Sequence, residues 1–339
     1  RYGTVTGVQT CALPISNMVA LGVAAGLLGL PQGEVAKIVE QSLRKRSDTL
    51  KASLGAVDAG YAAAAEIGAD YALASPGTAA ASRWLVSGNQ AAGYGAIRGG
   101  VRFCAAYPIT PATEMLEYLA PALADVGGVL VQAEDELASV NMIIGASFGG
   151  LPSITATAGP GLSLMTEAIG LAVASEVPIV VVDVMRGGPS TGIPAKSEQS
   201  DLSMAVYGLH GDAPRIVVAP NSIADCVVTT QWAVHLAEAL QSPALVLSDQ
   251  YFGQTRAVVD RPADVAFVGN RLTAEPNTEG YKRYALTDSG LSAMAIPGTP
   301  GVAYTADGLE HNERGTPSSQ ARDHNRQLAK REQIGRAHV

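Results

Sequence analysis

Cysteine is scarce in this sequence, and no Cys-x-x-Cys pair is present. Cys11, Cys104 and Cys226 lie far apart along the chain. We interpret them as buried or incidental thiols in a reducing compartment. We therefore expect this chain to carry no iron–sulfur cluster and no structural zinc. The histidines share no metal-ligand spacing either, so no metal site is predicted.

Basic clusters and long apolar runs are also lacking. The chain has 23 basic against 31 acidic residues, and its one dense basic cluster, residues 44–46, is typical of a solvated helix end. Nucleic-acid binding is therefore not expected. The apolar run at residues 18–30 is too short to span a bilayer and has no basic flank before it. We expect no membrane anchor and a cytoplasmic protein.

The composition is that of a folded protein. Hydrophobic residues make up 47% and charged residues 16% of the 339 positions, which supports a substantial core and excludes disorder over most of the chain. This length allows two domains, or one domain with extensions. Neither a Gly-x-Ser-x-Gly elbow nor a Walker phosphate loop is present.

Strand and helix patterns alternate from residue 101 onwards. Short runs rich in valine and isoleucine, separated by helical patterns, favour an α/β fold with a doubly wound, mostly parallel sheet. We predict strands at residues 101–106, 129–132, 153–157, 179–184, 215–218 and 244–247. We predict helices at residues 111–124, 136–147, 162–174, 202–209 and 223–240, after a helix that begins at residue 88.

The chain before and after this alternation is organised differently. Residues 17–30, 32–46 and 51–68 have helical patterns, whereas residues 10–14 should break any helix. After residue 260 the pattern becomes polar and rich in proline, with a further helix expected at 322–333. We predict a non-native leader (1–16), the end of a domain (17–76), a linker (77–87), the α/β domain (88–262) and a connection to a missing domain (263–339), its last few residues also non-native.

Four successive predicted strands end in loops that could form one site. The loops contain residues 107–111 (Tyr-Pro-Ile-Thr-Pro), 134–136 (Glu-Asp-Glu), 157–161 (Thr-Ala-Gly-Pro-Gly) and 186–192 (Arg-Gly-Gly-Pro-Ser-Thr-Gly). Ligands of open parallel sheets bind outside the carboxyl ends of the strands. On local rules alone, however, the first loop is typical of a proline-stiffened turn and Arg186 of a surface residue.

These motifs, in this order, resemble those of the 2-oxoacid:ferredoxin oxidoreductases. Residues 107–115 are similar to the family signature Tyr-Pro-Ile-Thr-Pro-Ser-Thr-Glu-Met, with Ala112 in place of serine, and residues 198–202 and 248–250 also match. The resemblance covers residues 88 to about 261 and is closest to the alpha subunit of the 2-oxoglutarate type. It implies a pyrimidine-binding, transketolase-like domain for thiamine diphosphate, and makes residues 17–76 the remnant of a fused gamma domain.

The resemblance assigns roles to individual residues. Glu136 would contact N1′ of the aminopyrimidine as the catalytic carboxylate, although a carboxylate at a helix start can also simply favour the helix dipole. Arg186 and Thr110 would bind the 2-oxoacid, since a guanidinium can hold a carboxylate through two hydrogen bonds. The cofactor-binding residues implied by the family are Tyr107, Pro108, Ile109, Glu136, Gly159, Gly187 and Gly188.

Cofactors and partners follow from the same resemblance. The diphosphate and its Mg²⁺ need a Gly-Asp-Gly segment, which residues 211–213 do not provide. A separate beta subunit is expected to supply these ligands and a [4Fe-4S] cluster, with ferredoxin, coenzyme A and the 2-oxoacid as further partners. A non-redox thiamine diphosphate enzyme and a catalytically silent binding subunit are the alternatives. The sequence leaves open which 2-oxoacid is used, which electron acceptor, and the stoichiometry of the complex.

Overall fold

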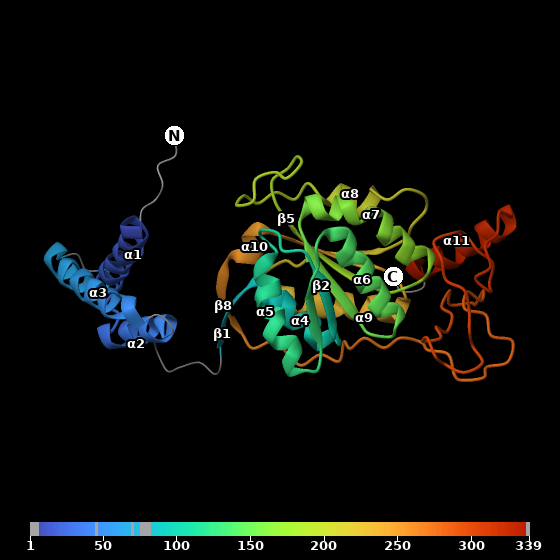
Figure 1. Cartoon of the computed structure of the whole chain (residues 1–339), viewed down its shortest axis with the longest axis horizontal. Coiled ribbons are helices and arrows are strands. Elements are labelled where there is room, and N and C mark those ends of the chain that lie inside the picture. Colours follow the sequence, from blue (N-terminus) through green and yellow to red (C-terminus); the bar gives the residue numbers. More distant parts are fainter. Residues whose placement is uncertain (1–6, 45–46, 69–70, 75–82, 337–339) are drawn as a thin grey trace. The chain divides into compact units, whose positions relative to one another are not determined.

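The computed structural model of the chain describes residues 7–44, 47–68, 71–74 and 83–336. It divides into two compact units between residues 81 and 82, and each unit is described by itself. Figure 1 labels their helices and strands. No helix in the described part of the chain is both long and apolar enough to cross a membrane.

The first unit consists of three helices. These are α1 (Gly7–Leu27), α2 (Gln32–Leu43) and α3 (Ser47–Ile67). Helices α1 and α3 pack closely, because Gly22 and Gly60 have no side chains to separate the two backbones. The expected helix break at residues 10–14 is wrong: α1 runs from Gly7 to Leu27 and continues through Pro14, although a proline inside a helix lacks the main-chain N–H for its hydrogen bond. The assignment of this unit to a gamma domain stays a prediction.

The second unit is built on a six-stranded parallel sheet of order β3-β2-β4-β5-β7-β6. Its strands are β2 (Phe103–Ala106), β3 (Val129–Gln132), β4 (Ser153–Thr157), β5 (Val180–Met185), β6 (Ile216–Val218) and β7 (Ala244–Asp249). The predicted α/β fold with a mostly parallel sheet is confirmed, and each predicted strand is present within two residues of its expected ends.

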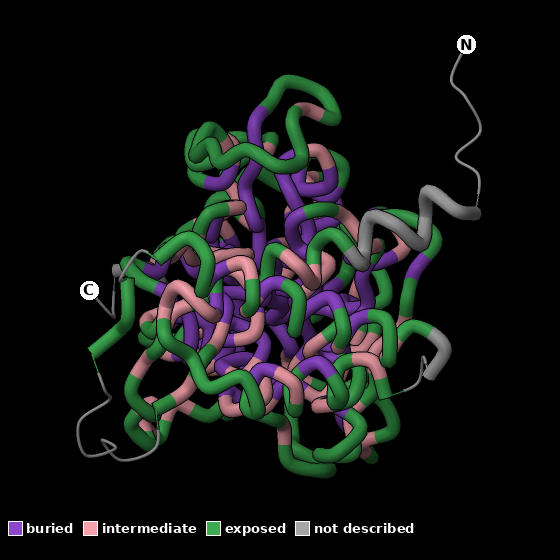
Figure 2. The backbone as a smooth tube through the Cα atoms, turned by 90° about the vertical axis from the view of Figure 1, so that its left-hand side faces the viewer, coloured by how far each residue is buried: buried purple, intermediate pink, exposed green. Residues whose placement is uncertain are grey.

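Helices cover both faces of this sheet. Helices α4 (Gly88–Gly99), α5 (Thr113–Asp125) and α9 (Asp225–Leu240) share one apolar core with the sheet. The opposite core contains α6 (Glu136–Phe148), α7 (Gly159–Ala174) and α8 (Leu202–Tyr207). In Figure 2 the buried positions lie inside the fold and the exposed positions along its outer loops. The structure is therefore a three-layer α/β/α arrangement.

A small second sheet was not expected. Strand β1 (Arg83–Ser87) pairs antiparallel with β8 (Arg256–Asp260), which follows the short helix α10 (Gln250–Gln254). The second half of the linker predicted at 77–87 is therefore a strand, and its first half lies outside the described residues. Strand β1 alternates partly buried and exposed positions, a pattern too short in five residues to stand out in the sequence.

The segment after β8 is folded, although it contains almost no regular structure before α11 (Ala321–Arg336). Figure 1 shows it running along the lower border of the larger unit to α11. It buries Arg283, Tyr284 and His311 completely or nearly so. Because these side chains are inside the protein, the segment is an integral part of the larger unit; whether it also connects to a further domain stays a prediction.

Candidate functional site

The chain reverses direction within the sheet between β2 and β4. From β2 it moves outward to β3 across one face, and it returns over the other face to β4. The two strands pair only through Phe103 with Ser153 and Cys104 with Ile154. They separate beyond that point, towards their carboxyl ends. Such a switch point is where ligands bind in open α/β sheets.

The loop after β2 carries Thr110 to this crevice. Tyr107 and Thr110 are exposed, Pro108 and Ile109 partly buried, and the Thr110–Pro111 peptide bond is cis. Helix α5 begins at Thr113, two residues later than the proline start that the sequence predicts. Thr110 thus lies in a turn before the helix, with its side chain accessible.

Asn89 on α4 supports this turn from beneath. It is 2% exposed, and its Nδ2 donates to the carbonyl of Pro111 (2.8 Å) and to Glu114 (3.3 Å). Glu114 in turn accepts a hydrogen bond from Gln254 of α10 (2.6 Å). The position of Thr110 therefore depends on two helices distant in sequence. Sequence reasoning did not identify Asn89.

Glu136 is the first residue of α6 and is buried. The helix starts here because Asp135 is its N-cap, with its carboxylate accepting from the Ala138 amide (2.6 Å). A Cβ on Gly161 would collide with Thr157 Oγ1 and lie 2.8 Å from Glu136 Cγ and 2.9 Å from Oε1. The Glu136 carboxylate therefore lies against the start of α7, in space that only glycine at position 161 leaves free.

Arg186 follows β5 and joins the loops after β2 and β5. Arg186 is 7% exposed. Its guanidinium donates to the main-chain carbonyls of Thr110 and Thr191, whereas its Nε has no acceptor among the described residues. A buried N–H without an acceptor is costly and is suited to binding an incoming one. The structure thus brings together Thr110 and Arg186, as the sequence predicts.

The glycines after Arg186 begin a long loop that projects from the end of β5 in Figure 1. Gly187 is buried and donates to the Lys196 carbonyl (2.9 Å), while the exposed Gly188 donates to Glu198 (2.9 Å). These hydrogen bonds fold residues 187–198 back towards the sheet. We call residues 186–201 the β5 loop.

Two aspartates near the base of the β5 loop have unusual surroundings. Asp183, inside β5, is fully buried, and burial together with neighbouring Asp201 raises its pKa well above the ordinary value. Burial also raises the pKa of Asp201, as does the charge of Glu198. Sequence reasoning quoted Asp201 within a motif without giving it a role. The charged residue in an otherwise apolar strand was the available signal for Asp183.

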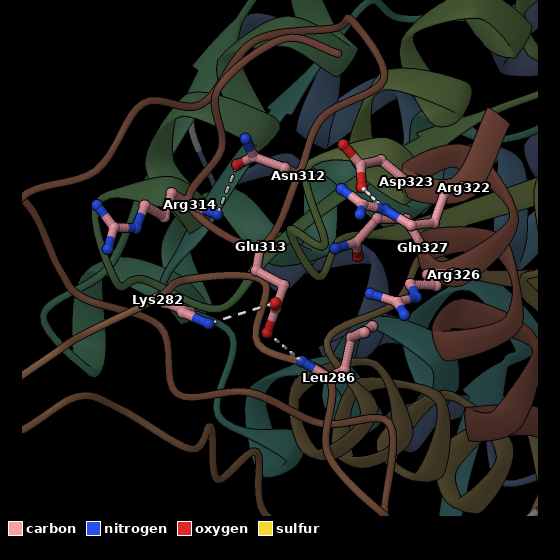
Figure 3. Close-up of a pocket in the computed structure, with 9 residues that line it drawn as sticks. All are labelled: Lys282, Leu286, Asn312, Glu313, Arg314, Arg322, Asp323, Arg326 and Gln327. Carbon is pink, nitrogen blue, oxygen red and sulfur yellow. Dashed lines mark hydrogen bonds and ion pairs between the residues drawn. The ribbon is translucent and has the colours of Figure 1, made fainter. Parts of the chain in front are cut away.

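A pocket lies outside the candidate site, elsewhere in the larger unit. It has a volume of about 270 Å³ and is shown in Figure 3. Lys282, Arg314, Arg322 and Arg326 contribute positive charge, while Glu313 accepts hydrogen bonds from Lys282 and from the Leu286 amide (3.3 Å each). All its lining residues belong to the C-terminal segment and α11. None of the sequence-predicted site residues is among them.

Comparison with known proteins places these observations in context. Residues 94–330 match the family model described as pyruvate flavodoxin/ferredoxin oxidoreductase, thiamine diphosphate-binding. The 2-oxoglutarate synthase subunit KorA of Methanothermobacter marburgensis is 40% identical over 250 residues, which are 73% of this chain and 66% of that protein. The 2-oxoglutarate oxidoreductase subunit KorA of Mycobacterium tuberculosis is 36% identical over 304 residues, 87% of this chain and 46% of that protein.

A solved structure is similar over nearly the whole chain. The 2-oxoglutarate:ferredoxin oxidoreductase from Magnetococcus marinus, with 2-oxoglutarate, coenzyme A and succinyl-CoA bound, has a TM-score of 0.84 and 41% identity. The match covers 97% of this chain and 59% of that one. The chain thus spans about two thirds or less of the length of the relatives it matches.

Proposed function

Because the chain belongs to the pyruvate flavodoxin/ferredoxin oxidoreductase family and contains its thiamine diphosphate-binding domain, we propose that it works as the alpha subunit of a 2-oxoacid:ferredoxin oxidoreductase. The substrate proposed is 2-oxoglutarate, which the similar Magnetococcus marinus enzyme binds together with coenzyme A. The full enzyme would convert the 2-oxoacid and coenzyme A to an acyl-CoA and carbon dioxide, with the two electrons passing to ferredoxin.

The observation that carries this proposal is the environment of Glu136. Its carboxylate is buried at the start of α6 and has no hydrogen bond or ion pair with the described residues. Gly161 leaves room for this side chain at the start of α7, because a Cβ at position 161 would lie 2.9 Å from Glu136 Oε1. This fits a group that needs a carboxylate partner on a ring nitrogen, as the aminopyrimidine of thiamine diphosphate does. Glu136 would accept a hydrogen bond from that nitrogen and hold the ring in place.

Thiamine diphosphate, when bound, supplies the carbanion that attacks the 2-oxo group and stabilises the charge left by decarboxylation. The chain's residues would orient the substrate. Arg186 would bind the 2-oxoacid carboxylate, through its free Nε–H and the guanidinium hydrogens not directed at Thr110 and Thr191. The exposed Thr110 hydroxyl would donate to the same substrate. The cofactor would lie against the main chain of six further residues: Tyr107, Pro108, Ile109, Gly159, Gly187 and Gly188.

A beta subunit completes the proposed enzyme. The described residues contain no group of three or more metal-ligating side chains that could hold an ion. In this proposal, which follows the family resemblance, Mg²⁺, the diphosphate ligands and the [4Fe-4S] cluster belong to that partner. Ferredoxin would receive the electrons there, and this chain would provide the pyrimidine and substrate half of the site.

The test uses the full-length protein co-expressed with its candidate beta subunit. We expect anaerobic, coenzyme A-dependent reduction of a viologen dye by 2-oxoglutarate, with pyruvate and branched-chain 2-oxoacids as comparisons. Glu136→Gln should lower the rate at least about 100-fold, the usual size of a lost acid–base contribution. Glu134→Gln, on the same loop but exposed, should leave the rate within about twofold.

Different failures have different meanings. If a folded complex containing thiamine diphosphate and its clusters reduced no dye with any 2-oxoacid, the redox function would be refuted. Decarboxylation without dye reduction would indicate the non-redox thiamine enzyme. Full activity in Glu136→Gln would refute the role of Glu136, and a complex that does not bind thiamine diphosphate would favour a silent binding subunit.

A further inference from the structure

The buried carboxyl group of Asp183 has neither a hydrogen-bond donor nor a cation as a partner among the described residues. It is in the middle of β5, between Val182 and Val184, and is 0% exposed. Neither of its carboxyl oxygens receives a hydrogen bond from a donor in the described part of the chain. An ionised carboxylate in this position would lose its hydration without compensation. The side chain must therefore be neutral or share a proton.

Asp201, at the end of the β5 loop, faces Asp183 and can accept that proton. Its Oδ2 is buried without another partner, and its carboxylate oxygens lie 2.6 and 2.7 Å from where a Cβ on Gly159 would be. Two ionised carboxylates have only acceptors, but one proton between them provides an O–H donor and an acceptor. Asp201 therefore contacts both β5, through Asp183, and the first residue of α7.

We propose that Asp183 and Asp201 share one proton at neutral pH and thereby fasten the β5 loop to the strand and to the start of α7, which makes them positioning residues for Arg186. The connection is short: Asp183 precedes Arg186 by three residues on β5, and Asp201 ends the loop that Arg186 begins. With both ends of the loop held, Thr191 stays where its carbonyl accepts from the guanidinium. This inference rests on the proposed role of Arg186 in substrate binding.

The groups around the pair favour a single shared proton. Glu198 on the β5 loop adds negative charge near Asp201. On the β4 side, Thr157 is paired with Asp183 across the sheet, and the Thr157 hydroxyl and Glu136 both lie against Gly161. On the β7 side, Leu247 is opposite Asp183. No cation among the described residues forms an ion pair with either aspartate, so protonation is the available way to compensate the pair.

The first experiment measures how firmly the β5 loop is held in the 339-residue chain. Lys196 is exposed on this loop, so tryptic cleavage after Lys196, followed by mass spectrometry, reports its opening. Asp201→Ala should increase this cleavage rate about tenfold or more, as expected for losing a hydrogen bond to a charged group. Asp183→Asn, whose amide can still donate to Asp201, should not change it. Asp212→Ala, an exposed aspartate outside the loop, is the matched control.

The second experiment observes the proton directly. In the chain labelled with [γ-¹³C]aspartate, one carboxyl signal should remain in its protonated position at neutral pH, and Asp183→Asn should remove it. The proposal is overturned if every aspartate is ionised at neutral pH, or if the protonated signal persists in Asp183→Asn. It is also overturned if Asp201→Ala leaves the cleavage rate at Lys196 unchanged.

Kinetics of the full-length enzyme with its beta subunit then connect the pair to Arg186. Asp201→Ala should raise the KM for the 2-oxoacid about tenfold and change kcat less, because ground-state binding depends on the guanidinium position. The single variant Asp183→Asn, which keeps a donor to Asp201, should have a KM close to that of the wild type. An unchanged KM in Asp201→Ala would refute the positioning role. Absence of any 2-oxoacid activity would instead count against the proposed function, and the cleavage and carboxyl signals would still decide whether the pair exists.

Discussion

Glu176 joins the C-terminal segment to the larger unit. Its carboxylate accepts hydrogen bonds from Lys330 Nζ on α11 (2.5 Å to each oxygen) and from Arg283 (3.3 Å). Ser292 lies in the same cluster, 3.0 Å from Lys330 Nζ. The side chains of Glu176, Arg283 and Lys330 are 3%, 0% and 1% exposed, so solvent does not screen these charges. One anion thus compensates two buried cations.

Glu176→Gln should destabilise the larger unit strongly. Removing one member of a buried ion pair typically costs about 3–5 kcal/mol, because the remaining charge is buried without compensation. Glu176→Gln leaves both Lys330 and Arg283 in that state, so we expect a loss at the upper end of this range. Lys330→Met leaves Glu176 paired with Arg283 and should cost less. Arg322, whose side chain is 71% exposed beside the partly buried Asp323, provides the control: Arg322→Met should cost under about 1 kcal/mol.

Urea unfolding followed by tryptophan fluorescence measures these differences. The two tryptophans, Trp84 and Trp232, both belong to the larger unit, so the signal does not include the three-helix unit. Faster proteolysis within residues 261–320 should accompany the destabilisation in Glu176→Gln. If Glu176→Gln cost no more than Arg322→Met, or less than Lys330→Met, the charge argument would be refuted.

Three further predictions concern single side chains. Burial raises the pKa of Cys104 and of Cys226 to about 12, so both thiols should react with a thiol reagent at neutral pH only as fast as the protein unfolds. The pKa of Asp183 is raised in the folded state, so the stability of the wild type should fall as pH rises above the ordinary aspartate pKa. The expected slope is about 1.4 kcal/mol per pH unit. Urea titrations at several pH values should show this slope for the wild type and not for Asp183→Asn. Gly161→Ala should lower the melting temperature and weaken thiamine diphosphate binding, whereas Gly145→Ala, in open space on α6, should be neutral or stabilising.

Sequence patterns predicted the parallel sheet well because its strands are buried on both faces. Runs such as residues 179–184 contain almost only Val and Ile, and flanking helices complete the repeating unit. The loops of the candidate site were also predictable, because the carboxyl ends of parallel strands meet at one edge. The contact of Arg186 with the Thr110 carbonyl agrees with this expectation.

The C-terminal segment was not predictable from local pattern. Its order depends on buried polar contacts such as Arg271 with Glu238 (2.8 Å) and His311 with the Ala174 carbonyl (3.0 Å). These contacts join residues far apart in sequence, and their polar members look like solvent-exposed residues in a linear reading. Periodicity detects apolar faces, so it cannot detect a segment held by buried ion pairs.

Two site residues were missed in the sequence for the same reason as the C-terminal segment: their partners lie far away along the chain. Glu136 and Arg186 are recognisable because they lie in loops or at a helix start just after strands, whereas Asn89 and Asp183 act from inside a helix and a strand. Their effect depends on what lies opposite: the Pro111 carbonyl for Asn89, and Asp201 for Asp183. A buried polar side chain can be conspicuous in sequence, but its partner is set by strand order and register. Residues that contact ligands can thus be proposed from sequence, and those that position them require the fold.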